Sequence, residues 1–178
     1  KKHFSFVATN CHRLITTLDT FQSRKPQIHD AYNTLVDLVS WLDQLAASTT
    51  DESCILAVGA ASKKLKEYLK DKKQQSVRLL KAIRCLDPIQ LPSLDVSSYP
   101  TLKADLHLPE NCEGEWVIYL GLAGDIGQSK PKPISFWKAV YQRVPRLATH
   151  AVLLLQLPVN SADVERSFSK YNQIFTAQ

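Results

Sequence analysis

The sequence predicts a mainly helical protein, and three observations lead to that prediction. Glycine is scarce, with 5 among 178 residues. Along most of the chain, apolar residues recur at intervals of three and four, which matches the turn of an α-helix rather than the alternation of a strand. Hydrophobic residues make up 44% of the chain, an ordinary share for a globular protein. We therefore expect a helical chain that forms one domain, or one lobe of a larger one.

Three helices are predicted in the first part of the chain. The first covers about residues 9–23 and ends before Pro26, which cannot continue a helix. The second covers about residues 27–47 and carries a continuous apolar stripe. The third follows a cluster of cap-forming residues at positions 48–50, and Asp51 and Glu52 suit the positive end of its dipole. We expect this third helix to break near residues 70–75, where its apolar stripe lapses.

A basic stretch accompanies the third helix and its continuation. Its positive residues are Lys63, Lys64, Lys66, Lys70, Lys72, Lys73, Arg78, Lys81 and Arg84, against only Glu67 and Asp71. Such a stretch can attract phosphate backbones in a salt-dependent way, although a solvated helix face is the open alternative. The candidate nucleic-acid-binding residues are Lys63, Lys64, Lys70, Lys73, Arg78 and Lys81. No run of aromatic residues interleaves with the basic ones to stack on bases, so we do not expect sequence-specific recognition.

Residues 88–133 are predicted to connect the two ends of the chain with little regular structure. Prolines and glycines are frequent there, and only a short helix near residues 115–120 is expected. His107 and Cys112 lie near Glu110 and Glu113, which loosely suggests a metal site, but a loop without metal is the stronger interpretation.

The four cysteines exclude two classes of small protein. Cys11, Cys54, Cys85 and Cys112 lie tens of residues apart and form no C-x-x-C pair. This spacing argues against a zinc finger and against a disulfide scaffold. We expect free, mostly buried thiols in a reducing compartment.

Three further helices are predicted from residue 134 onward. The first, at about residues 134–142, includes Phe136 and Trp137. The second opens at Pro145, where the missing N–H costs nothing, and is apolar nearly all round. A strand at residues 151–157 is the alternative there. The last is capped by Asn160 or Ser161 and has one apolar face. That face consists of Val164, Phe168, Tyr171, Ile174 and Phe175.

The same C-terminal part carries a specific series of motifs. Phe136-Trp137 is followed by VPRLA at residues 144–148 and by LPVNSADVERSFS at residues 157–169. The series resembles the C-terminal end of hAT-superfamily transposases, where FW, YP-x-L-x-x-L-A and L-x-(I/L)-P-x-x-S-A-x-x-E-R-x-F-S follow in this order. Val144 stands where the family has tyrosine, and the close match spans residues 136–175. Weaker similarity to the same family occurs at residues 80–88 and 115–119.

The resemblance implies a domain organisation and a catalytic residue. In such transposases a large helical domain is inserted into an RNase H-like core. Residues 1–87 would then be part of the insertion domain, residues 88–133 a connecting region, and residues 134–178 the dimerisation region with the closing helices of the core. Glu165 corresponds to the third metal-binding carboxylate, which would act with Mg²⁺ or Mn²⁺ if the parent protein is active. An ion pair with Lys170, Lys138 or Arg166 is the structural alternative for Glu165.

The function implied by the resemblance is dimerisation and scaffolding in a nuclear, transposase-derived DNA-binding protein. The candidate dimerisation residues are Trp137, Tyr141, Leu147, Phe168, Tyr171 and Phe175, each of which could equally belong to the core of one chain.

The strands of a catalytic core are not found in the sequence, so the chain alone is not expected to be an enzyme. A catalytic lobe of an active transposase is the alternative. The expected partners are a second copy and, through regions outside this chain, DNA. No apolar run reaches the roughly 18–20 residues that a membrane span needs, so no membrane partner is expected. The chain has no methionine, and we interpret it as a piece of a longer protein.

Overall fold

The computed structural model describes residues 2–22, 27–71, 73–96, 99–126 and 130–159, and every regular element in these ranges is a helix. The elements are α1 (Lys2–Gln22), α2 (Ile28–Ser48), α3 (Glu52–Lys70), α4 (Gln75–Ala82), η1 (Ile83–Leu86), η2 (Leu91–Ser93), α5 (Tyr99–Leu106), α6 (Glu113–Gly124), α7 (Pro133–Val140) and α8 (Pro145–Leu155). The prediction of a mainly helical fold is confirmed. The alternative of a strand at residues 151–157 is wrong, since α8 occupies most of that range.

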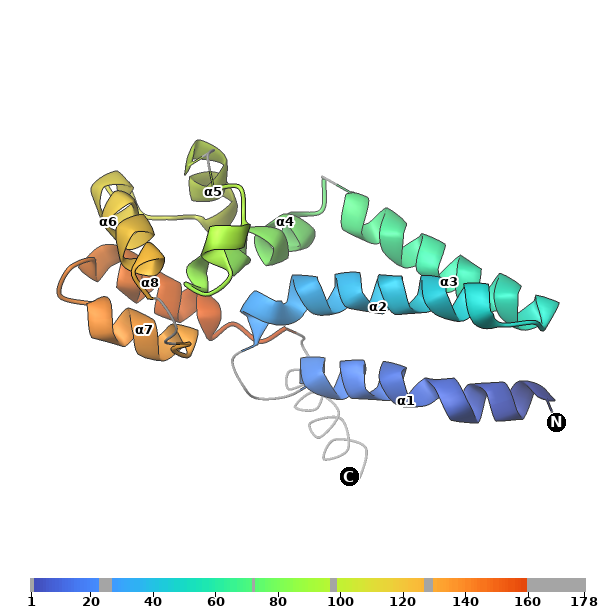
Figure 1. The fold of residues 1–178 in the computed structure, drawn as a ribbon. Coiled ribbons are helices and arrows are strands. Elements are labelled where there is room, and N and C mark those ends of the chain that lie inside the picture. Colours follow the sequence, from blue (N-terminus) through green and yellow to red (C-terminus); the bar gives the residue numbers. More distant parts are fainter. Residues whose placement is uncertain (1, 23–26, 72, 97–98, 127–129, 160–178) are drawn as a thin grey trace, which may run out of the picture.

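Three long helices form one end of the molecule (Figure 1). α2 and α3 form a hairpin, and α1 lies along α2. The cap of α3 is Asp51 rather than one of residues 48–50, because the Asp51 side chain accepts a hydrogen bond from the backbone N–H of Cys54 at 3.2 Å. The predicted break is also confirmed, because α3 ends at Lys70 and α4 begins at Gln75. α1 begins earlier than predicted: Thr9 lies inside it, and its hydroxyl donates to the carbonyl of Ser5 at 2.9 Å.

The short helices α4 to α8 gather with η1 and η2 at the other end (Figure 1). They enclose the main hydrophobic core, which α2 joins through Ile28. The side chains of η1 lie at its centre, because Ile83, Cys85 and Leu86 are almost fully buried. The same core includes Leu106, Tyr119, Trp137, Val144, Leu147 and Leu155, all fully buried. Apart from Ile28, the residues of this core all come from positions 79–159.

The prediction of little regular structure at residues 88–133 is wrong. That range contains η2, α5 and α6, and α6 is longer than the short helix expected there. Trp116, Tyr119 and Ala123 are buried at intervals of three and four along α6. This packing outweighs the low helix propensity of the three glycines in α6. The turn between α5 and α6 holds His107 and Asn111 at positive φ angles of 51° and 61°.

Candidate self-association surface on α7 and α8

α7 is anchored to the core by two aromatic side chains. Phe136 and Trp137 are both buried, and Trp137 donates from its indole N–H to the carbonyl of Leu86 at 2.7 Å. The ring centroids of Trp137 and Tyr119 lie 4.4 Å apart, and the Tyr119 hydroxyl donates to the carbonyl of Cys85 at 2.7 Å. Both donors therefore satisfy carbonyls of η1 that would otherwise be buried without a partner. The position of α7 is fixed by these contacts.

α8 is held at its N-terminus by a carboxylate from α6. Glu115 accepts hydrogen bonds from the backbone N–H groups of Leu147, at 2.8 Å, and Arg146, at 3.4 Å. These are among the helix N–H groups that have no partner within the helix, and a negative charge is favourable there. On the side of α8 that faces α5, the ring N–H of His150 donates to the carbonyl of Leu106 at 2.9 Å. The rotation of α8 about its axis is set by these bonds.

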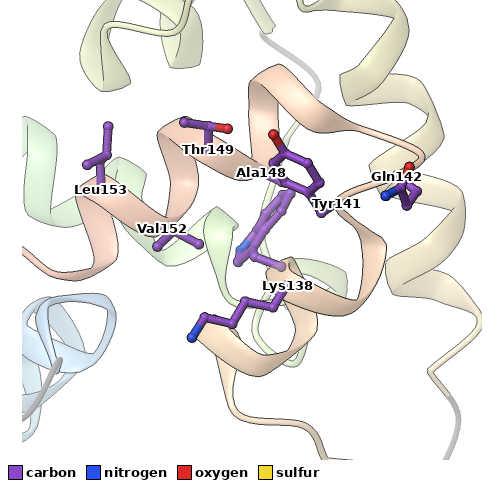
Figure 2. Close-up of a pocket in the computed structure, with 8 residues that line it drawn as sticks. Lys138, Tyr141, Gln142, Ala148, Thr149, Val152 and Leu153 are labelled. Atoms are coloured by element: carbon purple, nitrogen blue, oxygen red, sulfur yellow. The ribbon is translucent and has the colours of Figure 1, made fainter.

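Between α7 and α8 the surface is hollowed into a groove of about 400 Å³ (Figure 2). Its lining residues are Trp137, Lys138, Tyr141, Gln142, Ala148, Thr149, Val152 and Leu153. Tyr141 is 48% exposed and Leu153 is 61% exposed. We call this feature the α7–α8 groove. Its lining is largely apolar although it opens to solvent.

The predicted dimerisation residues fall into three groups. Tyr141 lines the α7–α8 groove and is exposed. Trp137 and Leu147 are fully buried in the core of the single chain; Trp137 also lines the groove, whereas Leu147 does not. Phe168, Tyr171 and Phe175 lie outside the described residues, as does Glu165. Val152 and Leu153 were not selected from the sequence, because the apolar residues all round α8 predicted a helix buried on every side.

The candidate nucleic-acid-binding residues are distributed over α3, α4 and the turn between them. Lys63, Lys64 and Lys73 are exposed. Lys70, Arg78 and Lys81 meet at a cleft of about 770 Å³, which Arg84 also lines. The charge of this cleft is mixed, since Asp71, Asp95 and Asp105 line it as well. Arg78 pairs with Asp105 at 3.3 Å, and Arg84 stacks on the ring of Tyr32 at 4.6 Å.

The suggested metal cluster around His107 does not assemble. Cys112 is buried, whereas Glu113 pairs with Lys103 at 3.1 Å and His107 contacts Gln75. In the described ranges, the residues that do gather with metal-binding atoms within 4.8 Å are the neighbours His29 and Asp30 and the distant Asp87.

A polar network already occupies the space among His29, Asp30 and Asp87. The amide N–H₂ of Gln90 donates to Asp30 at 2.9 Å and to Asp87 at 3.0 Å. The orientation of that amide is fixed, because its oxygen accepts from Asn33 at 2.8 Å and Asn33 in turn accepts from Arg84 at 3.0 Å. The cluster therefore joins α2 to η1 and η2 by hydrogen bonds between side chains.

All four cysteines are free, as predicted. Cys54, Cys85 and Cys112 are buried, and burial raises the pKa of the Cys85 thiol to about 12. This thiol therefore stays protonated at neutral pH and serves as a small apolar group in the core. Within the described ranges, none of the helices combines the length and the apolar composition that a membrane span requires.

Comparison with known proteins identifies the C-terminal part. Residues 119–178 match the family model described as the hAT family C-terminal dimerisation region. No curated protein and no solved structure matches the chain. The matched residues begin within α6 and take in α7, α8 and the whole α7–α8 groove. The C-terminal part of this chain is therefore similar to the dimerisation region of hAT-family proteins.

Proposed function

We propose that this chain is the module through which a transposase-derived protein forms dimers and holds its other regions together. The observation that carries the proposal is the family match over residues 119–178, because it includes a described surface that is both apolar and hollowed. Isolated apolar residues on a surface are common and need no explanation. Here, in contrast, Tyr141, Val152 and Leu153 line one groove on two helices whose positions are fixed.

The test is the mass of the chain in solution over a wide range of concentration. One chain has a mass of 20.0 kDa, and a dimer has twice that. Light scattering and sedimentation equilibrium are expected to show concentration-dependent conversion between these masses. A strict monomer up to high micromolar concentration would overturn the proposal.

We further propose that the parent protein works in the nucleus, on DNA, and that its C-terminal helices complete an RNase H-like core. The support is the family match alone, and no strand of such a core occurs among the described residues. Catalysis by the parent is the alternative function, with Glu165 as one ligand of Mg²⁺ or Mn²⁺. One carboxylate does not fit a pair of divalent ions, so this chain does not hold them by itself. In the full-length protein, Glu165→Gln is then expected to abolish DNA cleavage without affecting folding.

Contact between this chain and DNA is expected to be weak and independent of sequence. The supporting observation is that Lys70, Arg78 and Lys81 converge on one cleft, although acidic residues share it. Affinity for a duplex of random sequence should fall steeply between about 50 and 200 mM salt. Binding that ignores ionic strength would contradict this part of the proposal.

A further inference from the structure

We propose that the cleft bordered by α4 and α5, which we call the α4–α5 cleft, binds a nucleoside phosphate through the side chains of Lys70, Lys81 and Arg84. The inference goes beyond dimerisation, and it narrows the proposed contact with DNA from a basic surface to a single site. A free nucleotide and the phosphorylated end of a strand share this chemistry, and the experiment below distinguishes them.

The α4–α5 cleft has the size and lining of a site for one nucleotide. Its volume of about 770 Å³ lies within the range of about 300–1,000 Å³ that is usual for small-molecule sites. α4 packs against α5, and the end of α3 and Tyr32 of α2 complete the rim (Figure 1). Much of the lining is apolar, and it includes Val77, Ala82, Leu94, Val96 and Leu102. Burial of a planar base against such side chains is favourable.

Three positive side chains at the cleft have no carboxylate partner among the described residues. They are Lys70 at the end of α3, Lys81 in α4 and Arg84 in η1. Arg78 differs from them, because it pairs with Asp105 at 3.3 Å. A phosphate monoester carries between one and two negative charges at neutral pH, so it supplies the charge that these three side chains lack.

Arg84 is the least exposed of the three and is already held in place. Its guanidinium lies 4.6 Å from the ring centroid of Tyr32 and donates to the side chain of Asn33 at 3.0 Å and to the carbonyl of Lys81 at 3.1 Å. These partners are all neutral, and burial lowers the pKa of Arg84. An anion therefore stabilises this partly buried charge, and a side chain that is ordered beforehand loses little entropy on binding.

The acidic residues of the cleft indicate which anion fits. Asp71, Asp95 and Asp105 line it together with the positive residues. Their charges repel a ligand that is negative along its whole length, whereas carboxylate oxygens accept hydrogen bonds from hydroxyl and amino groups. A nucleoside phosphate has its charge at one end, hydroxyl and amino donors elsewhere, and a planar ring. The mixed lining therefore favours this class over a simple anion.

The experiment titrates the full chain with adenosine 5′-monophosphate in a calorimeter. Inorganic phosphate and adenosine are titrated separately, because each represents one part of the nucleotide. The nucleotide is expected to bind saturably, with a dissociation constant at least about ten-fold below that of either part, since both parts then occupy one site.

Charge reversals at the rim locate the site. Lys70→Glu and Lys81→Glu, both at exposed positions, should each raise the dissociation constant of the nucleotide about ten-fold. Lys64→Glu is the matched control, because Lys64 is exposed on α3 but lies outside the cleft. Circular dichroism checks that each variant is folded. In NMR spectra of the wild-type chain, the amide shifts caused by the nucleotide should concentrate at residues 77–85 and 94–105.

Two oligonucleotides distinguish the sources of the ligand. One single strand carries a 5′-phosphate, and the other has the same sequence with a 5′-hydroxyl. Tighter binding of the phosphorylated strand than of the nucleotide and of the unphosphorylated strand assigns the cleft to a strand end. Binding of the nucleotide at least as tight as that of the phosphorylated strand assigns the cleft to a free nucleotide.

Four results overturn the inference. Phosphate that binds as tightly as the nucleotide shows a simple anion site, and adenosine that binds as tightly shows that the positive side chains take no part. Equal weakening by Lys64→Glu shows general attraction rather than a site. A chain that binds duplexes of random sequence but not the nucleotide keeps the proposed contact with DNA and loses only this inference. The mass of the chain in solution tests the proposed dimerisation independently of all four.

Discussion

The two ends of this molecule bury their apolar residues to different degrees. In the C-terminal region, formed by η1, η2 and α4 to α8, large side chains such as Trp137 and Tyr119 are fully buried. In the N-terminal region, formed by α1 to α3, Ile15 and Leu18 are more than half exposed, and no described side chain of α1 is buried. The comparison teaches that the stability of this chain resides in the C-terminal region, while the N-terminal helices form a thinner layer that can open locally.

The largest expected difference between the regions comes from their tryptophans. Trp137→Ala should lower the free energy of unfolding by about 3–5 kcal/mol, because it leaves a cavity and removes the donor to the Leu86 carbonyl. Trp41→Ala, in α2, should cost about 1–2 kcal/mol, because Trp41 is only partly buried and contacts Arg13 at 5.6 Å. Urea denaturation followed by circular dichroism measures both. Equal losses of unfolding free energy in the two variants would contradict the difference between the regions.

A second pair of variants compares one hydrogen bond in each region. Tyr119→Phe removes a fully buried hydroxyl and leaves the Cys85 carbonyl without its donor, which should cost about 1–3 kcal/mol of unfolding free energy. Ser62→Ala removes a bond of 2.6 Å to Asp43, whose carboxylate is exposed and can be solvated instead, so the loss should stay below about 1 kcal/mol. The same denaturation measurement applies. A larger loss for Ser62→Ala would show that the hairpin of α2 and α3 is the more constrained region.

Two glycines test whether the regions unfold together. Gly59 in α3 and Gly121 in α6 are within helices, and an added Cβ would meet no atom within 4 Å at either position. Alanine should therefore stabilise each helix by about 0.5–1 kcal/mol. Hydrogen exchange should show Gly121→Ala slowing the core amides and Gly59→Ala slowing only those of α2 and α3. Equal slowing of the core by both variants would mean that the chain unfolds as one unit.

The smallest effect expected is a pH dependence confined to the N-terminal region. Hydrogen bonds from Lys66 and Ser62 hold the pKa of the Asp43 carboxyl below its ordinary value of 3.8. A carboxyl whose pKa is lowered by folding stabilises the folded state above its unfolded pKa and loses this contribution as the pH falls through the folded value. The pairing of α2 with α3 should therefore weaken below pH 3.8, and Asp43→Asn should flatten that dependence. NMR titration of α2 and α3 amides provides the measurement, and an unchanged titration in the variant would exclude this cause.

The helices that could be predicted were those whose signals were local. The polar residues at positions 48–51 and the proline at position 145 each marked the start of a helix that the structure contains. α5 was missed and α6 was predicted too short, because prolines and glycines outweighed the apolar spacing in the interpretation. Trp116 and Tyr119 lie three residues apart in the sequence. That spacing identifies a buried helix face only when the helix packs against α7 and η1.

The candidate surface was harder to predict than the helices. α8 carries apolar residues on nearly all of its sides, and the sequence does not indicate which of these sides the core covers. The pattern selected Trp137 and Leu147 together with Tyr141, although the first two are fully buried in the chain's own interior. Tertiary packing decides which side of an apolar helix is left for a partner, and Leu153 could be recognised as exposed only once α7 and α6 were in place.

The two hydrogen bonds from Tyr119 and Trp137 to the carbonyls of η1 have a consequence for biosynthesis. Residues 85 and 86 are synthesised before both of their aromatic donors, and until those donors arrive these carbonyls depend on water. The centre of the protein therefore cannot close until residue 137 has emerged. A nascent chain stalled before that point exposes apolar residues to chaperones and proteases.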